Sequence, residues 1–156
     1  DGNVAVKRNL VVQRNLVVQG DNLVDKIQNM FCISYSETLT VTAGTFTNNG
    51  CSATLVGNTL YLYLNAKAKA AITAGNIKNQ TMLTITFTDN RISGLYTVSS
   101  SGGTSGPNSQ MSFDASSSGG QHTITVTLAA IAQNVASGGE INAYVALPCR
   151  LNWDAY

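Results

Sequence analysis

The chain has 156 residues, only 11% of them charged, and nine Lys and Arg residues nearly balance eight Asp and Glu residues. This length predicts one globular domain with an appendage, and the near-neutral balance argues against nucleic acid, which needs a clustered basic surface. Polar residues interrupt every hydrophobic stretch before the roughly 18 apolar residues of a membrane-spanning helix, so we expect no membrane insertion.

A six-residue repeat occupies the N-terminal segment, where RNLVVQ at 8–13 recurs at once at 14–19. The period differs from the seven-residue repeat of a coiled coil, and the aliphatic residues alternate as they do in a β-strand. Because the chain begins at Asp1 within this pattern, we expect it to be a fragment or a processed product. The aliphatic positions of the pattern are Val4, Val6, Leu10, Val12, Leu16 and Val18.

So few short repeats cannot build a core within one chain, which means that copies from other chains must cover them. We therefore predict that residues 1–24 form an intertwined β-prism or β-helix stalk of three chains. A plain N-terminal β-hairpin packed on the main domain is the alternative. Residues 25–30 show neither strand alternation nor a clear helical face, and we predict a linker there.

Residues 31–156 are predicted to form an antiparallel β-sandwich of jelly-roll type, with roughly eight to ten strands. Alternating apolar and Thr-rich runs predict strands, whereas Asn, Asp and Gly pairs predict hairpin turns. Two segments poor in apolar side chains are predicted to be exposed loops. The predicted strands include 38–42, 60–74, 83–88, 123–128 and 141–147, the last closed by Pro148; the turns lie at 48–50, 57–58 and 89–90, and the loops at 99–110 and 116–120.

The cysteines and the single histidine lack the spacing of a metal site. Cys32, Cys51 and Cys149 are far apart, and His122 belongs to no CxxC or HxxxH pattern, so we expect buried free thiols and neither a metal nor a cofactor. The carboxylates show no paired catalytic motif, and no Gly-x-Ser-x-Gly sequence accompanies His122. We therefore expect no enzymatic activity.

The C-terminal segment is the best candidate for saccharide binding. Trp153 could stack on a sugar ring while Asp154 and Tyr156 hydrogen-bond the sugar hydroxyls. Burial of Trp153 at the bottom of the sandwich or in a subunit contact is the alternative. Further candidates in or beside the predicted loops are His122, Asp114 and Asn108.

Two tyrosines alternate with leucines in one predicted strand. Tyr61 and Tyr63 lie between Leu60, Leu62 and Leu64, so both must point away from the leucine face. Exposed aromatic stripes usually mark contacts. We therefore predict that Tyr61 and Tyr63 belong to a subunit interface.

The hexads end in GDNLV at 20–24 and are followed by a Thr-, Gly- and Asn-rich β-domain. In this arrangement the chain resembles the receptor-binding proteins and tail-fibre tips of tailed bacteriophages. The segments LVGNTLYLYL at 55–64 and AITAG at 71–75 are similar to a stretch in the heads of those proteins. Many such heads then carry Leu-Pro-x-Gly-Phe/Tyr-Arg-Pro, whereas residues 76–80 here are NIKNQ.

This resemblance implies a homotrimer at the tail tip of a virion, where it contacts other tail or baseplate proteins. It also implies a head that binds a cell-wall or capsular saccharide of the host without catalysis. Two alternatives remain open at this point: a purely structural fibre or baseplate component, and a bacterial adhesin or carbohydrate-binding module.

Overall fold

The computed structural model describes residues 17–18, 21–22, 32–35, 38–75, 79–99 and 109–152. Within these ranges there is no helix, all paired strands are antiparallel, and the predicted all-β class is confirmed. The described part therefore also holds no helix that could cross a membrane. The strands are β1 (Val17–Val18), β2 (Asp21–Asn22), β3 (Cys32–Ser34), β4 (Thr40–Ala43), β5 (Phe46–Val56), β6 (Thr59–Ala68), β7 (Gln80–Thr88), β8 (Ile92–Leu95), β9 (Val98–Ser99), β10 (Ser109–Ser118), β11 (Gln121–Ile131) and β12 (Glu140–Leu151).

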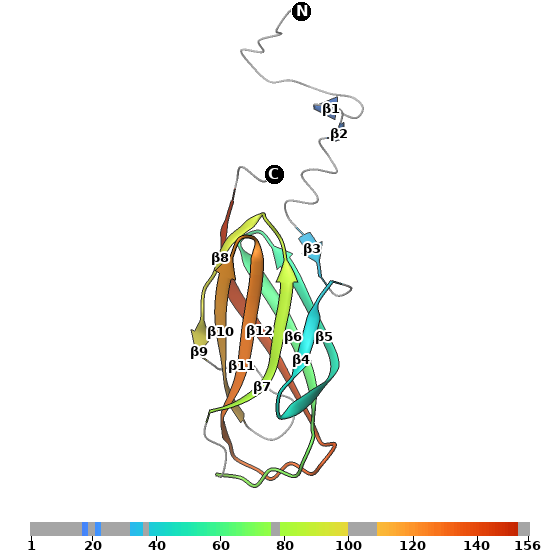
Figure 1. The fold of residues 1–156 in the computed structure, drawn as a ribbon, viewed down its shortest axis with the longest axis vertical. Coiled ribbons are helices and arrows are strands. Elements are labelled where there is room, and N and C mark those ends of the chain that lie inside the picture. The colour runs from blue at the N-terminus through green and yellow to red at the C-terminus, as the bar shows by residue number, and fades with distance from the viewer. Residues whose placement is uncertain are drawn as a thin grey trace, which may run out of the picture.

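Two five-stranded sheets form the main β-domain, which we call the head, and lie as two layers in Figure 1. Sheet I has the strand order β4-β7-β11-β10-β9, and sheet II has the order β3-β5-β6-β12-β8. Their inward side chains form one apolar cluster, to which β6 contributes Leu62, β7 contributes Ile85 and β11 contributes Ile124. This arrangement is compatible with a β-sandwich. Within the described part of the chain, the short strands β1 and β2 pair with each other and with no other strand.

The core follows the predicted alternation along the long strands. Burying one Leu, Ile, Val or Phe side chain stabilises the fold by about 1.5–3 kcal/mol relative to leaving it exposed. Alternation therefore directs one face of each strand inward while Thr, Tyr and Asn occupy the other face. The buried residues of these strands include Leu60, Leu62 and Leu64 in β6, Leu83, Ile85 and Phe87 in β7, Ile124, Val126 and Leu128 in β11, and Ile141, Ala143, Val145 and Leu147 in β12.

The predicted turn at 57–58 is confirmed, whereas the one at 48–50 is wrong. Gly57 has a φ of +58° in the two-residue turn between β5 and β6, which is typical of a type II′ hairpin. Asn48 and Gly50 lie inside β5, where the register against β6 shifts between them. Gly50 has a φ of +137°, so its conformational freedom serves a β-bulge and not a chain reversal.

Two other predicted strand ends differ from the structure. After β7 the chain leaves sheet I and enters sheet II as β8, so residues 89–90 join two sheets and do not close a hairpin. Pro148 does not end the last strand, which continues to Leu151 and pairs with β8 beyond the proline. Proline removes only a donor, and the Pro148 carbonyl still accepts the Tyr96 N–H at 3.0 Å.

The remaining segment predictions are partly wrong. The strand predicted through 66–74 ends at Ala68, after which Ile72 forms an isolated bridge with Val135. The loop predicted at 116–120 is the end of β10 plus a two-residue turn. Gly119 and Gly120 of this turn have φ values of +57° and +78°. Residues 100–108, the predicted linker at 25–30, and the predicted stalk apart from β1 and β2 lie outside the described residues.

Candidate functional site

The outer face of sheet II carries an aromatic cluster formed by β6 and β12. Tyr61 and Tyr144 are 53% and 63% exposed, and Tyr63 is half-buried. The register places Tyr63 directly opposite Tyr144, and their ring centroids are 4.7 Å apart at an interplanar angle of 35°. The prediction that Tyr61 and Tyr63 point away from the leucine face is confirmed, because Leu60, Leu62 and Leu64 are buried beneath them.

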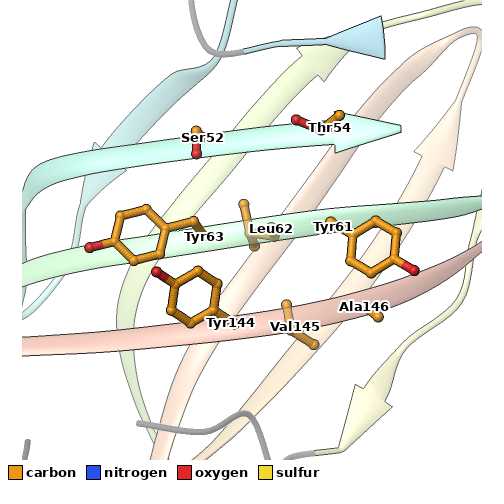
Figure 2. Close-up of a pocket in the computed structure, with 8 residues that line it drawn as sticks. All are labelled: Ser52, Thr54, Tyr61, Leu62, Tyr63, Tyr144, Val145 and Ala146. Atoms are coloured by element: carbon orange, nitrogen blue, oxygen red, sulfur yellow. The ribbon is translucent and has the colours of Figure 1, made fainter. Parts of the chain in front are cut away.

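Neighbouring strands complete this surface, which Figure 2 shows from outside. Ser52 of β5 lies opposite Tyr63, and Thr54 lies opposite Tyr61, which in turn pairs with Ala146 of β12. A shallow depression of about 390 Å³ lies among these side chains. We call this surface the tyrosine face and define it as Ser52, Thr54, Tyr61, Tyr63, Tyr144 and Ala146.

One end of the tyrosine face is bordered by a polar rim, which we define as Asn49, Asn65, Lys67, Glu140 and Asn142. The Asn49 Nδ2 donates to Asn65 Oδ1 at 3.1 Å and to Glu140 Oε1 at 3.2 Å. The Lys67 ammonium lies 3.3 Å from the same carboxylate oxygen. The Tyr63 hydroxyl donates to Asn142 Oδ1 at 3.5 Å, which connects the rim to the rings. The rim groups therefore already bind one another.

The outer face of sheet I has a different chemistry. Its strands align hydroxyl groups side by side, and the side chains are half-buried or exposed. Asp114 ends one of these rows and is exposed, accepting a hydrogen bond from the Ser112 hydroxyl at 3.4 Å. We call this surface the hydroxyl face; two of its rows are Thr42–Thr84–Thr125–Asp114 and Thr40–Thr86–Thr123–Ser116.

His122 was predicted to end a surface loop, and this placement is wrong. Its side chain has no exposed surface, so it cannot touch a saccharide in this structure. The ring lies 2.8 Å from the Asp89 carbonyl oxygen through Nε2 and 2.8 Å from the Ser117 Oγ through Nδ1. A carbonyl can only accept, so Nε2 carries a proton and donates it to the Asp89 carbonyl. Both nitrogens are thus used within the fold.

A buried carboxylate, Asp89, lies beside His122, whereas the sequence of residues 89–90 predicts only a hairpin turn. Arg91 donates to both carboxylate oxygens of Asp89, at 2.8 and 2.7 Å, and the Tyr35 hydroxyl donates to Oδ2. Burial alone would raise the pKa of Asp89. The hydrogen bonds from Arg91 and Tyr35, together with the Arg91 charge, outweigh burial and hold this pKa below its ordinary value of 3.8.

All three cysteines are free thiols, but their predicted burial is confirmed for Cys149 alone. Cys32 is exposed, Cys51 is half-buried and Cys149 is buried. Burial raises the pKa of Cys51 and raises that of Cys149 to about 11, which leaves both thiols poorly reactive at neutral pH. Among the described residues, no three His, Cys, Asp or Glu side chains are grouped as metal ligands.

The structure describes only two of the six predicted saccharide contacts. His122 points into the core, whereas Asp114 lies on the outer face of sheet I, so the fold does not bring them together. The other four lie outside the described residues: Asn108, Trp153, Asp154 and Tyr156.

Comparison with known proteins identified no relative of this chain. No family model, curated protein or solved structure matches it. The chemistry of the two outer faces and the N-terminal repeat are therefore the basis for a functional proposal.

Proposed function

We propose that this chain is the trimeric receptor-binding tip of a phage tail fibre, with a jelly-roll-like head that attaches the virion to a saccharide of the host. The proposal rests on one observation above all: an aliphatic repeat that a single chain cannot bury is followed by an antiparallel β-domain. In this proposal residues 1–24 form the stalk, residues 25–30 the linker and the remainder the head.

The surface of the head supports saccharide as the ligand class. Sugars are bound by hydroxyl, amide and carboxylate groups together with aromatic rings, and binding an uncharged sugar needs few charges. The hydroxyl face presents rows of Thr and Ser that end at Asp114. In this proposal the ligand binds where the head remains exposed to solvent in the trimer. The candidate contacts are Asp114, Asn108 and the C-terminal Trp153, Asp154 and Tyr156.

Binding of the full chain to an array of bacterial cell-wall and capsular polysaccharides, both uncharged and charged, tests this function. We expect saturable binding to a small set of these polymers, and we expect the free chain to compete with phage adsorption to cells that display them. Trp153→Ala should weaken binding at least tenfold, whereas Lys69→Ala, an exposed control, should leave binding unchanged. A chain that binds no polymer and never competes would instead fit a structural fibre component.

A further inference from the structure

We infer that the tyrosine face packs against a second copy of this chain, so that the heads are joined as well as the stalks. This inference rests on the homotrimer of the proposed function and names the surface that forms its head contact. The face would thus be a protein interface and not the saccharide site. Three observations support this assignment.

The first observation is the contrast between the two outer faces. Among the described residues, four large apolar side chains are exposed, and all four lie on strands of sheet II or directly after one. Sheet I instead presents rows of hydroxyl groups. Exposed aromatic residues that gather on one sheet are typical of an interface and uncommon on the surface of a monomer. The four residues are Val56, Tyr61, Tyr96 and Tyr144.

The second observation is that the surface has the composition of an interface, with an apolar and aromatic centre and a polar rim. Tyr61 and Tyr144 offer large rigid rings with one polar end, which interfaces favour. The charges at the rim are paired within the chain, because Lys67 lies 3.3 Å from Glu140. Covering the tyrosines therefore need not bury an unpaired charge.

The third observation concerns where the chain enters the head. β3 is the first strand of the head and pairs with β5 at the edge of sheet II. Copies joined through residues 1–24 therefore enter their heads through this sheet and not through sheet I. The tyrosine face therefore lies on the sheet that follows directly from the proposed stalk and linker.

A saccharide fits this surface less well than a second copy. Tyr63 and Tyr144 already stack on each other, which occupies part of each ring. The amide and carboxylate groups next to them form hydrogen bonds among themselves. A sugar would have to break those bonds, whereas a protein surface can cover the rings and leave the rim intact.

Thiol labelling of the full chain distinguishes the two occupants. In a Cys32→Ser background, Ala146→Cys places a thiol within the tyrosine face, and Ser116→Cys places one on the hydroxyl face; both native residues are exposed. Cys51 and Cys149 contribute little because their pKa values are raised. We expect maleimide to modify position 146 at least tenfold more slowly than position 116.

A pair of charge variants provides the second measurement. Tyr61→Glu with Tyr144→Glu should raise the concentration at which the oligomer dissociates at least tenfold. Thr42→Glu with Ser116→Glu, two exposed positions on the hydroxyl face, should leave it unchanged. Circular dichroism checks that both double variants keep the β-fold.

Equal labelling of the two thiols in an oligomeric chain would overturn this inference and leave the trimeric tip intact. Slow labelling of position 146 that requires added polysaccharide would assign the face to the ligand and would also overturn it. Slow labelling without polysaccharide, in a chain that binds no saccharide, would support the interface and refute the proposed function alone.

Discussion

At the scale of single residues, the buried Asp89 joins several parts of the head. Its side chain binds Tyr35, which directly follows β3, and Arg91, which precedes β8. Its carbonyl binds His122 of β11, while the Arg91 carbonyl accepts the Asn152 N–H at 2.7 Å, just beyond β12. One polar cluster therefore ties the first strand of the head to the last.

Asp89→Asn should destabilise the head by about 2–4 kcal/mol at pH 7, because the buried carboxylate that accepts hydrogen bonds from Arg91 and Tyr35 would be replaced by a neutral amide that cannot accept all of them. Urea unfolding at one fixed protein concentration measures this loss. Asp114→Asn, at an exposed carboxylate, should change stability by no more than about 0.5 kcal/mol. Equal effects of the two substitutions would show that the Asp89 cluster contributes little.

The same carboxylate predicts a pH dependence. The pKa of Asp89 is lower in the folded chain than its ordinary value of 3.8, so the folded chain binds this proton more weakly than the unfolded chain. The contribution is therefore complete above about pH 4 and is lost as the pH falls through the folded pKa. Wild type should lose more stability than Asp89→Asn between pH 5 and pH 2; parallel pH profiles would contradict this.

At the scale of strands, alternation was a sound guide to which side chains point inward. It correctly directed Tyr61 and Tyr63 outward, and the same rule applied to Ile141, Ala143, Val145 and Leu147 would also have identified Tyr144 as exposed. Its consistent use would have placed His122 inside, since His122 shares the parity of Ile124 and Val126.

Local sequence could not decide the turns and partners of these strands. Residues 48–50 and residues 57–58 both combine Asn with Gly, yet only residues 57–58 form a turn that reverses the chain. The difference arises from the register against β6, which depends on contacts remote in sequence. The stacking of Tyr63 on Tyr144 likewise depends on the pairing of β6 with β12, which no local pattern specifies.

Gly44, between β4 and β5, lies close to the backbone of β7. A Cβ there would lie 2.3 Å from the Thr81 carbonyl oxygen and 2.7 Å from that of Met82. Because both contacts are with backbone, we expect Gly44→Ala to destabilise the head by about 2 kcal/mol or more in urea unfolding.

Gly94 of β8 provides the matched control for Gly44. Its added Cβ would meet only the Arg150 Cβ, at 3.9 Å, which is an ordinary contact. Gly94→Ala should therefore change stability by less than about 1 kcal/mol. If both alanines were tolerated equally, the close approach at Gly44 would not constrain the crossing from β4 to β5.

At the scale of the whole molecule, the two sheets present different uncharged surfaces, which accounts for the low charge of the chain. Sheet I remains polar through hydroxyl groups, whereas sheet II exposes tyrosines that a neighbouring copy could cover. The class of fold and the outward direction of Tyr61 and Tyr63 followed from periodicity alone. A site assembled from residues distant in sequence could not be predicted from periodicity. Periodicity specifies on which face of a strand a residue lies, but not which strands lie beside it.

The mass of the intact chain in solution tests the central claim most directly, since the proposed stalk and the proposed contact at the tyrosine face are both formed with other copies. Sedimentation equilibrium at micromolar concentration should give about three times the 16.4 kDa of one chain. Leu10→Asp with Leu16→Asp should lower this mass, because charged residues in the repeat cannot be buried between subunits. A mass of 16.4 kDa for the unmodified chain would contradict the account.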